Sequence, residues 1–530
     1  MGDAASVRAE LLARLREAVE YDLVVVGGGA TGLGVALDAT ARGLRVALVE
    51  SDDFAAGTSS RATKLVHGGV RYLAQGDIGL VREALHERAA MLANAPHVAQ
   101  RLPFVMPGYH WWERGFYGIG LKAYDALAGR RSLGATEWLS SARTRALLPG
   151  ARAQGLWGGV RYWDAQFDDA RYALLLARTA RARGALVLNH CPAVDLVREG
   201  GRVRGVVVRD AETGVAATLR ARCVVNAAGV WVDAVRALDR DPEAPARPPL
   251  VAPSQGVHLV VDRSFMPGGH ALLIPRTADG RVLFAVPWLG KTILGTTDTP
   301  RHDLAREPTP YAAEVEFILG EAARVLARPP RREDVRSIWV GLRPLVKPQA
   351  DDGDANTKAI SREHTVIVGR SGLVTVTGGK WTTYRAIAED VLEHAMTRGL
   401  LPRRPGGATT RLPLLGAAPG RTLTEAPGEH LYGSEAARLR ELPGAANWLW
   451  RDPETGAGGL SEAMVRFAAR EEMAREVGDM LARRSRLLFL DAAAAGALAD
   501  RVAALLAEET GREVDPAGFK ALALQYRSLP

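Results

Sequence analysis

Hydrophobic positions near the start of the chain occur first at helical spacing and then in short continuous runs. An amphipathic leading helix is predicted from the apolar residues Val7, Leu11, Leu12, Leu15 and Val19. Residues 23–26 and 45–49 are short apolar runs whose length suits buried strands, and a helical run rich in alanine separates them. This order predicts a strand–helix–strand unit with parallel strands.

Further along, helical periods alternate with strand-like runs that are bounded by glycine-containing turns. Helices are predicted over residues 78–93, 110–131, 167–183, 459–491 and 492–510. Strands are predicted over residues 185–188, 193–197, 203–209, 216–221, 223–225, 253–261, 271–274, 282–288, 292–297, 365–368 and 373–377. Because 530 residues are too many for one core, we expect several domains.

Glycines follow the first predicted strand directly. Gly27, Gly29 and Gly32 form the pattern G-x-G-x-x-G, and Glu50 ends the second strand. Such glycines permit a tight turn, close approach of a pyrophosphate and close packing of the helix, whose N-terminus attracts phosphate. A carboxylate at Glu50 can accept hydrogen bonds from ribose hydroxyls. The arrangement predicts a dinucleotide-binding site.

The predicted helix over residues 110–131 has aromatic and basic residues interleaved. Its apolar positions Phe116, Ile119, Gly120, Ala123 and Leu127 lie on one face. Such a helix either packs inside a domain or lies in a lipid interface, and the sequence leaves both alternatives open.

Composition is that of a soluble globular protein, with a net charge of +8. The positive charge is compatible with an anionic membrane surface, nucleic acid or an anionic substrate, or with a genome that favours arginine. Cys191 and Cys223 are the only cysteines, so no disulfide framework or cysteine metal cluster is expected, and a reducing compartment is indicated. No apolar stretch is long enough to span a membrane, and the N-terminus does not read as a signal peptide.

Residues 53–73 combine small, hydroxylic and basic side chains, which suits a ligand-binding loop. Thr58, Ser59 and Ser60 can donate hydrogen bonds to phosphate or ribityl oxygens. We expect a basic and aromatic set to complete this part of the site; it comprises Lys64, His67, Arg71 and Tyr72.

Candidates for the remaining contacts come from later segments. Ala228 and Gly229 are small residues after a strand, suited to close passage beside a cofactor. Arg343 and Arg362 can bind an anion by forked hydrogen bonds. His258, predicted at the start of a strand, and His67 are candidate bases. A further predicted helix begins near Gly378, and the cofactor contacts expected there are Gly379, Lys380, Thr382 and Thr383.

Three stretches of the chain resemble the FAD-dependent glycerol-3-phosphate dehydrogenases. They are Thr-Ser-Ser…Lys-Leu-Val-His-Gly-Gly-Val-Arg-Tyr-Leu, Gly-Leu-Arg-Pro-Leu and Gly-Gly-Lys-Trp-Thr-Thr-Tyr-Arg. The resemblance implies an α/β, glutathione-reductase-type FAD-binding fold with a β-rich substrate domain and an all-α C-terminal domain. The expected division assigns residues 18–85, 150–250 and 330–398 to FAD binding, 86–149 and 251–329 to the substrate domain, and 399–530 to the C-terminal domain. It implies FAD as cofactor and Arg343, Arg362, Arg71, Tyr72 and Lys380 at the substrate.

By the same resemblance, hydride passes from C2 of sn-glycerol 3-phosphate to flavin N5, and electrons pass to a membrane quinone. His67, His258, Arg343 and Lys380 are the expected catalytic residues, on a protein attached peripherally to the inner face of the cell membrane. No nucleic acid or metal is expected. Open alternatives are an oxidase using oxygen, another flavin amine or hydroxyacid oxidase, and a non-catalytic flavin- or nucleotide-binding module. The Arg483–Arg484–Ser485–Arg486 cluster is either a solvated face or a contact with lipid headgroups or with the second subunit of a homodimer.

Overall fold

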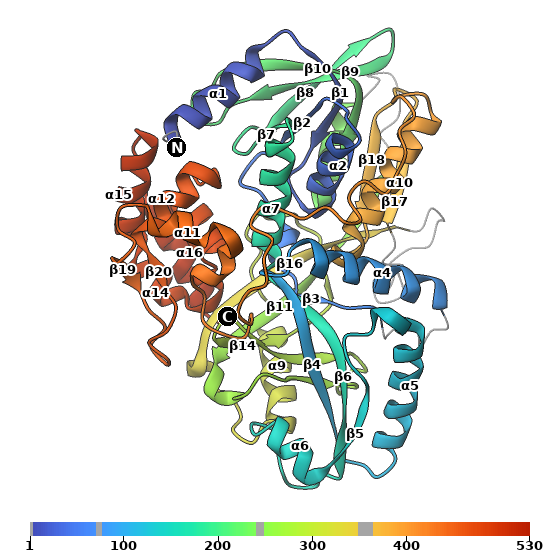
Figure 1. The fold of residues 1–530 in the computed structure, drawn as a ribbon, viewed down its shortest axis with the longest axis vertical. Helices are drawn as coiled ribbons and strands as arrows, with labels where there is room; N and C mark the ends of the chain where they lie inside the picture. The colour runs from blue at the N-terminus through green and yellow to red at the C-terminus, as the bar shows by residue number, and fades with distance from the viewer. Residues whose placement is uncertain (1–3, 70–76, 240–247, 348–363) are drawn as a thin grey trace.

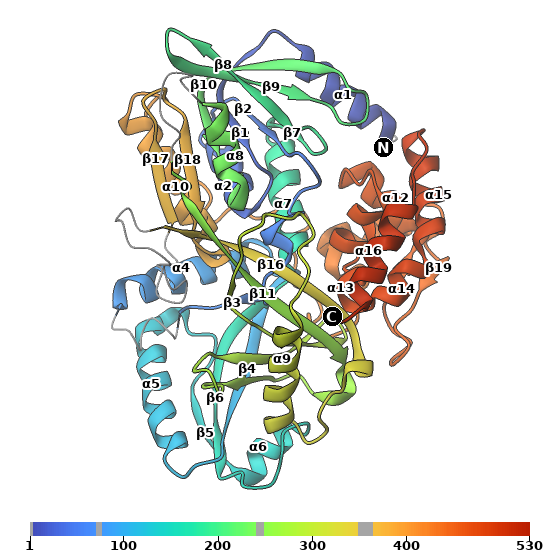
Figure 2. The same cartoon turned by 180° about the vertical axis from the view of Figure 1, so that it is seen from behind.

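Two sheets and a set of C-terminal helices make up the protein. The computed structural model describes residues 4–69, 77–239, 248–347 and 364–530. In Figure 1 the first sheet lies at the top, the second at the bottom, and the C-terminal helices at the left. In the view from behind (Figure 2) the two sheets again lie at the top and bottom, and the C-terminal helices are at the right.

The first sheet has eight strands within the described residues. The order along its main path is β17 (His364–Val368), β18 (Val374–Gly378), β10 (Ala216–Asn226), β1 (Glu20–Val26), β2 (Val46–Val49) and β7 (Leu186–Leu188). From β18 to β7 all neighbours are parallel. An antiparallel meander of β8 (Ala193–Glu199) and β9 (Arg202–Arg209) extends from β10.

Three helices pack side by side on this sheet: α2 (Ala30–Ala41), α7 (Asp169–Ala182) and α10 (Tyr384–Thr397). Strand β1 is almost fully buried from Leu23 to Val26, as its continuous apolar run predicts. The strands predicted over 216–221 and 223–225 form the single strand β10, and α1 (Ala4–Arg16) ends before Val19.

The second sheet has ten strands within the described residues. Its main path is β15 (Thr299–Pro300), β11 (Val251–Asp262), β14 (Lys291–Gly295), β13 (Leu283–Trp288), β12 (Ala271–Ile274), β4 (Ala99–Gly108), β6 (Gly158–Phe167) and β3 (Leu65–Val66). Strand β16 (Val335–Val346) pairs with β11, and β5 (Glu137–Ser140) pairs with β6. The helices of this part are α4 (Ile78–Asn94), α5 (Glu113–Ala128), α6 (Ser141–Leu147) and α9 (Ala312–Val325).

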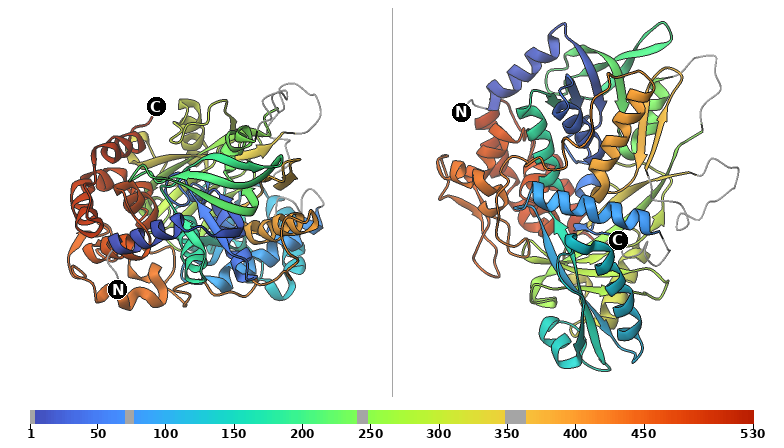
Figure 3. Two further views of the ribbon diagram at one scale, coloured as in Figure 1. Left: turned by 90° about the horizontal axis from the view of Figure 1, so that it is seen from above. Right: turned by 45° about the vertical axis from the view of Figure 1, so that its right-hand side comes forward.

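The C-terminal region is mainly helical, with one short hairpin of β19 (Trp448–Trp450) and β20 (Leu460–Ser461). Its helices are α11 (Ala436–Arg440), α12 (Glu462–Glu471), the π-helical turn η8 (Asp479–Arg484), α13 (Leu487–Leu490), α14 (Ala492–Ala497), α15 (Ala499–Thr510) and α16 (Ala517–Arg527). The predicted helix over 459–491 is therefore several elements. Seen from above (Figure 3, left), these helices occupy one side of the molecule.

The cluster Arg483–Arg484–Ser485–Arg486 is not a solvated face, because Arg484 and Arg486 are at most 1% exposed. It lies between the C-terminal helices and the first sheet, and its ion pairs reach Asp53 and Asp169 within the same chain. The expectation of a lipid or dimer contact at this cluster was also wrong.

Candidate active site

The parallel strands of the first sheet end at one edge and bring separated segments together there. Val26, the last residue of β1, is paired with Val49 of β2 and Asn226 of β10, and Asn226 is paired with Thr375 of β18. The glycine motif, Glu50, Ala228–Gly229 and the segment after β18 therefore follow four neighbouring strands. This edge is where parallel α/β sheets bind their ligands.

The glycine turn between β1 and α2 has no room for side chains at two positions. Gly27 has φ +116°, and a Cβ atom there would lie 2.5 Å from the carbonyl oxygen of Ala227. A Cβ atom at Gly32 would lie 1.9 Å from the carbonyl oxygen of Gly27. At these two glycines the turn packs directly against the backbone of the segment after β10, and helix α2 packs directly against the backbone of the turn. The N-terminus of α2 therefore lies at the sheet edge.

Two polar side chains complete this turn. The Gly28 N–H donates to Glu50 Oε2 at 2.6 Å, and the Ala30 N–H donates to Ser59 Oγ at 2.9 Å, beside Gly29. Burial raises the pKa of Glu50, and the bond from Gly28 opposes this shift. Glu50 and Ser59 are thereby held at the helix N-terminus, where a dinucleotide needs acceptors for its ribose and donors for its phosphates.

The loop of residues 58–67, called the site loop below, runs from the first sheet to the second. Its Thr58 hydroxyl donates to the carbonyl oxygen of Leu342 at 2.5 Å, and buried Ser60 accepts bonds through its carbonyl. Lys64 was expected to bind cofactor, but its fully buried ammonium donates to Ser60 O at 2.7 Å and to Asp169 Oδ2 at 2.8 Å. Burial lowers the pKa of Lys64 to about 7 against the opposing effect of Asp169. These contacts give Lys64 the geometry of a support for the loop.

The segment after β18 turns sharply and enters α10 through a 3₁₀ turn, η6 (Trp381–Thr383). Gly379 has φ +78°, and a Cβ atom there would lie 2.4 Å from the Ile387 side chain. Lys380 precedes the turn, Thr382 is buried, and the Thr383 hydroxyl donates to Lys380 O at 3.3 Å. Trp381 donates from Nε1 to Ser59 O at 2.8 Å, which ties this turn to the site loop.

The segment after β10 is tied to the same edge. The Ala228 N–H donates to Asn226 Oδ1 at 3.3 Å, and Gly229, with φ +60°, accepts a bond from the Thr377 hydroxyl at 3.3 Å. Ala228 and Gly229 therefore lie between β1 and β18, the position expected for a backbone that passes close to a dinucleotide.

His258 lies in the middle of β11 rather than at a strand start. It is 2% exposed, its ring stacks on Trp339 of β16 with centroids 5.2 Å apart, and its Nε2 is 2.9 Å from Thr63 Oγ1. Its Nδ1 is buried and has no hydrogen-bond partner among the described residues. Burial, with Lys64 and Arg343 nearby, holds the pKa of His258 well below its usual value of 6.5. The imidazole is therefore neutral at pH 7.

Arg343 lies on the same face of the β11–β16 pair as His258. Position 343 is paired with Ser254, and the guanidinium extends over Gly256, where a Cβ atom would lie 2.2 Å from Nη2. Nη2 donates to Thr297 O at 3.0 Å, and Nη1 is 3.5 Å from Asp298. The missing side chain of Gly256 thus leaves space for the Arg343 guanidinium. Gly256 is two residues before His258 on the same strand and the same face.

The other candidates differ in what can be said of them. The His67 side chain is exposed. Arg71, Tyr72 and Arg362 lie outside the described residues. The residues that sequence reasoning missed are Thr63, Trp339 and Asp298. Trp339 is distinguished from an ordinary core residue only by its strand pairing with His258, and Thr63 is distinguished from an ordinary loop residue only by its contact with that ring.

Comparison with known proteins agrees with this geometry. Residues 22–385 match a family described as FAD dependent oxidoreductase, and residues 378–515 match the C-terminal domain of alpha-glycerophosphate oxidase. Mitochondrial glycerol-3-phosphate dehydrogenase of Homo sapiens is 40% identical over 538 residues, which cover 95% of this chain and 72% of the human protein. This chain belongs to the FAD-dependent glycerol-3-phosphate dehydrogenase family.

Other members of the dehydrogenase family give the same result. The mitochondrial glycerol-3-phosphate dehydrogenase SDP6 of Arabidopsis thaliana is 40% identical over 537 residues, covering 92% of this chain and 82% of that protein. The solved structure of glycerol-3-phosphate dehydrogenase from Bacillus halodurans, complexed with FAD, has a TM-score of 0.76 and 29% identity; it covers 100% of this chain and 99% of that one. The predicted family, fold class, cofactor and enzyme class are confirmed.

The residues of the sheet edge fit FAD. The side-chain-free turn at Gly27 and Gly32, the α2 N-terminus and Glu50 suit its adenosine and pyrophosphate, and the η6 turn suits the flavin ring. Among the described residues, no helix combines the length and apolar character needed to cross a membrane.

Proposed function

We propose that the protein oxidises sn-glycerol 3-phosphate at C2 to dihydroxyacetone phosphate and passes the electrons to a membrane quinone. The observation that carries the proposal is the pairing of a neutral, buried imidazole with a guanidinium on one face of β11 and β16, where the site loop crosses that face. Oxidation of a phosphorylated alcohol needs these two groups, a base for the hydroxyl proton and a cation for the phosphate.

In this proposal His258 accepts the C2 hydroxyl proton. Thr63 fixes the ring: if Nε2–H donates to the Thr63 hydroxyl, Nδ1 keeps the lone pair that takes the proton. His258 is preferred because stacking on Trp339 and the hydrogen bond to Thr63 orient its ring on the buried face that also carries Arg343. Bound FAD would accept the hydride from C2 at N5.

Cationic side chains stabilise the negative charges of the substrate and of the flavin ring in this proposal. Arg343 holds the phosphate or the C2 oxygen through donors that its fixed guanidinium fork presents. Lys380, at the start of the turn before α10, lies where positive charge and backbone N–H groups favour an anionic ring edge. We propose that Arg71, Tyr72 and Arg362 complete the contacts to the phosphate.

An anaerobic titration tests the reaction. The purified yellow protein should lose its oxidised-flavin absorbance near about 450 nm when sn-glycerol 3-phosphate is added. His258→Asn should keep FAD but slow this bleaching by about 10²–10⁴-fold, while His67→Asn should slow it far less. Bleaching of His258→Asn at the wild-type rate would remove His258 as the base, and a wild type that never bleaches would remove the substrate.

The pH dependence is a second test of the base. Because burial and two cations depress the pKa of His258, the base stays deprotonated down to pH values below 6.5. The kcat/KM of the wild type should therefore remain flat from pH 8 to about 6.5 and fall only at lower pH. A fall centred at pH 7 or above would contradict the assignment.

For the acceptor, we propose a quinone reached at a membrane surface that the outer face of α5 contacts. This outer face comprises Phe116 and Ile119 of α5, together with the exposed Trp111 and Trp112 just before the helix and the exposed Trp138 of the neighbouring strand β5. Phe116 and Ile119 are 67% and 68% exposed, whereas the opposite face of the helix, with Leu121 and Tyr124, is buried. The apolar face noted in the sequence thus points outward, on the edge of the molecule away from the C-terminal helices (Figures 1 and 2).

Charge on this face favours anionic lipid. Arg114 and Lys122 are exposed on the same helix, and Arg130 and Arg131 follow it directly. Lys122 Nζ lies 5.5 Å from the centre of the Trp138 ring. Exposed tryptophans interleaved with basic residues match a helix that lies in a headgroup layer.

Sedimentation with vesicles containing phosphatidylglycerol tests this surface. Phe116→Ser with Ile119→Ser should weaken binding by about 100-fold or more, since each side chain contributes roughly 1.5–3 kcal/mol when fully buried. Leu524→Ser, which removes an apolar side chain that is 63% exposed on α16, is the matched control and should bind like the wild type. Wild-type binding by the double variant would rule out the outer face of α5.

The competing function is an oxidase that reduces oxygen. It is supported by the match of residues 378–515 to a domain named for alpha-glycerophosphate oxidase. Reduced protein mixed with air and, separately, with a soluble quinone separates the two. Fast reoxidation by quinone with little peroxide supports the dehydrogenase, and stoichiometric peroxide at a comparable rate would favour the oxidase.

A further inference from the structure

A buried arginine of the C-terminal region reaches the loop that carries the cofactor contacts. Arg486, immediately before α13, is 0% exposed. Its Nη2 donates to Ser60 O at 2.7 Å and to Asp169 Oδ1 at 3.0 Å, and its Nη1 donates to Ala482 O at 2.8 Å. One guanidinium therefore joins the C-terminal helices, the site loop and the start of α7.

Lys64 binds the same two acceptors from the other side. Its ammonium donates to Ser60 O and Asp169 Oδ2, and Asp169 Oδ2 also accepts from the Ala62 N–H at 3.1 Å. The carbonyl of Ser60 is thus shared by two cations, and the carboxylate of Asp169 holds both cations and the loop backbone. Removal of one cation from such a buried set leaves an acceptor without its partner.

The contacts continue from the C-terminal region to the proposed base. The Phe489 ring packs on Trp339 with centroids 5.1 Å apart, and Trp339 stacks on His258. Lys64 Nζ lies 5.3 Å from the ring centres of both Phe489 and Trp339. Because Thr63 directly precedes Lys64 and contacts His258, the position of the site loop sets the hydrogen bond at Nε2 of the imidazole.

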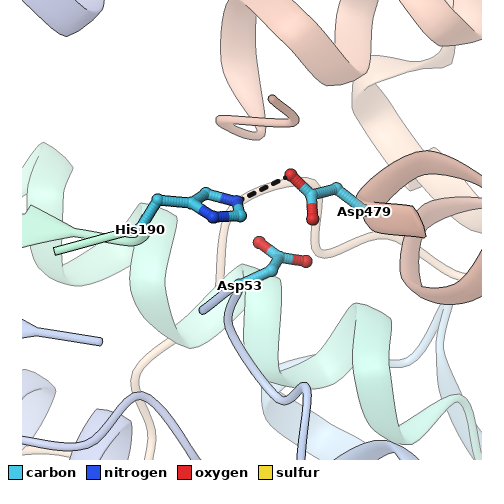
Figure 4. Close-up of side chains that lie close together, drawn as sticks. All are labelled: Asp53, His190 and Asp479. Carbon is cyan, nitrogen blue, oxygen red and sulfur yellow. Dashed lines mark hydrogen bonds and ion pairs between the residues drawn. The ribbon is translucent and has the colours of Figure 1, made fainter. Parts of the chain in front are cut away.

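A second set of ion pairs holds the adenosine side of the site. Arg484 pairs with buried Asp53, three residues after Glu50, and Asp53 also accepts from Arg483. Figure 4 shows Asp53 beside His190 and Asp479, whose ring and carboxylate are 2.9 Å apart. These carboxylates are close enough to suggest a metal site, but guanidinium groups already occupy them, so the cluster is an ion-pair network.

We propose that Arg486 is a positioning residue of the active site: from the C-terminal region it fixes the site loop, and with it Ser59 at the cofactor and Thr63 at His258. For FAD affinity the inference rests on the contacts of the loop; for turnover it rests on the function proposed above. Arg486 touches neither substrate nor cofactor in this scheme, so its loss should weaken FAD binding and lower kcat while KM for the substrate changes little.

Arg486→Gln, Arg486→Lys and Arg466→Gln form the test set. Arg466 of α12 is another ion-paired arginine of the same region, bonded at 2.7 Å to Glu508 and Glu509, which both lie on α15 and not on the site loop. The dissociation constant of FAD is measured by fluorescence titration of apoprotein whose folding is checked by circular dichroism. We expect it to rise at least tenfold in Arg486→Gln, to be partly restored in Arg486→Lys, and to stay within twofold of wild type in Arg466→Gln.

The FAD titration needs no substrate, so failure of the proposed reaction leaves this part of the test intact. Where the wild type turns over, kcat of Arg486→Gln should fall at least tenfold with KM within about twofold. A folded Arg486→Gln with wild-type FAD affinity overturns the proposal, as does an equal loss of affinity in Arg466→Gln. If Arg486→Gln does not fold, Arg486→Lys decides: a threefold or larger rise in the dissociation constant supports the role, and no change refutes it.

Discussion

Gly256→Ala should disable Arg343 without removing it. The added Cβ atom would lie 2.2 Å from Arg343 Nη2 and 2.7 Å from the Thr296 hydroxyl. Its φ angle is not in the left-handed region, so the backbone accepts alanine. The clash is with the end of a flexible side chain, and therefore the guanidinium moves while the strand stays.

The size of the displacement follows from ordinary contact distances. Van der Waals contact at this position begins at 3.4 Å, so the guanidinium must shift by about 1 Å. Such a shift breaks the 3.0 Å bond from Nη2 to Thr297 O. A misplacement of about 1 Å in a catalytic group costs about 10²-fold in rate, which corresponds to roughly 2.7 kcal/mol of transition-state stabilisation.

Steady-state kinetics with sn-glycerol 3-phosphate and a soluble quinone measures the effect. Flavin content and melting temperature of Gly256→Ala should match the wild type, while kcat/KM should fall by about 10²-fold. Gly320→Ala is the control, because nothing lies within 4 Å of the added atom in α9. A fully active Gly256→Ala would show that the position of Arg343 does not matter to the reaction.

Three further changes test other parts of the structure. Gly32→Ala places a Cβ atom 1.9 Å from Gly27 O, so the purified variant should carry less than about a tenth of the wild-type flavin by absorbance; yellow, fully loaded protein would contradict this. Thr63→Val removes the hydroxyl at His258 Nε2. Since one hydrogen bond contributes about 1–1.5 kcal/mol, kcat should fall about tenfold while the flavin content stays unchanged. An unchanged kcat would exclude an orienting role for Thr63. Burial and two arginines lower the pKa of His97 in the folded protein to about 4, below its unfolded value of 6.5. Between these pH values the unfolded state binds a proton that the folded state does not bind. The folded state therefore loses stability as the pH falls from 6.5 towards 4. The loss amounts to about 2 kcal/mol at pH 5 and about 3 kcal/mol near pH 4. The melting temperature of His97→Leu minus that of wild type should therefore be higher at pH 5 than at pH 7, and an unchanged difference would contradict this.

Local patterns predicted the nucleotide-binding part well. Strand β1, the turn at Gly27 and the carboxylate of Glu50 depend on near neighbours in the sequence, so periodicity and spacing define them. Strands β4 and β6 were missed, because Pro103 and Pro107 interrupt one and Gly158–Gly159 open the other. The two prolines are four residues apart, so their nitrogens face one side of the strand, and pairing with β6 survives.

Contacts between distant segments could not be predicted. Lys64 is in the expected loop, but only the packing of α7 and α13 shows that its ammonium is buried beside Asp169 and Arg486. The outward apolar face of α5 likewise depends on which side of the helix the second sheet covers. Periodicity identifies such a face, and tertiary structure alone decides whether it is inside or outside.

The bond between Arg486 and Ser60 O joins residues 426 positions apart in the chain. During translation at about 5–20 residues per second, roughly 20–85 s separate the synthesis of these two partners. The nucleotide-binding strand and its glycine turn emerge from the ribosome long before the arginine that fixes the neighbouring loop. Stable loading with cofactor is therefore expected only after Arg486 has left the ribosome, and chains cut short before residue 486 should accumulate as colourless protein.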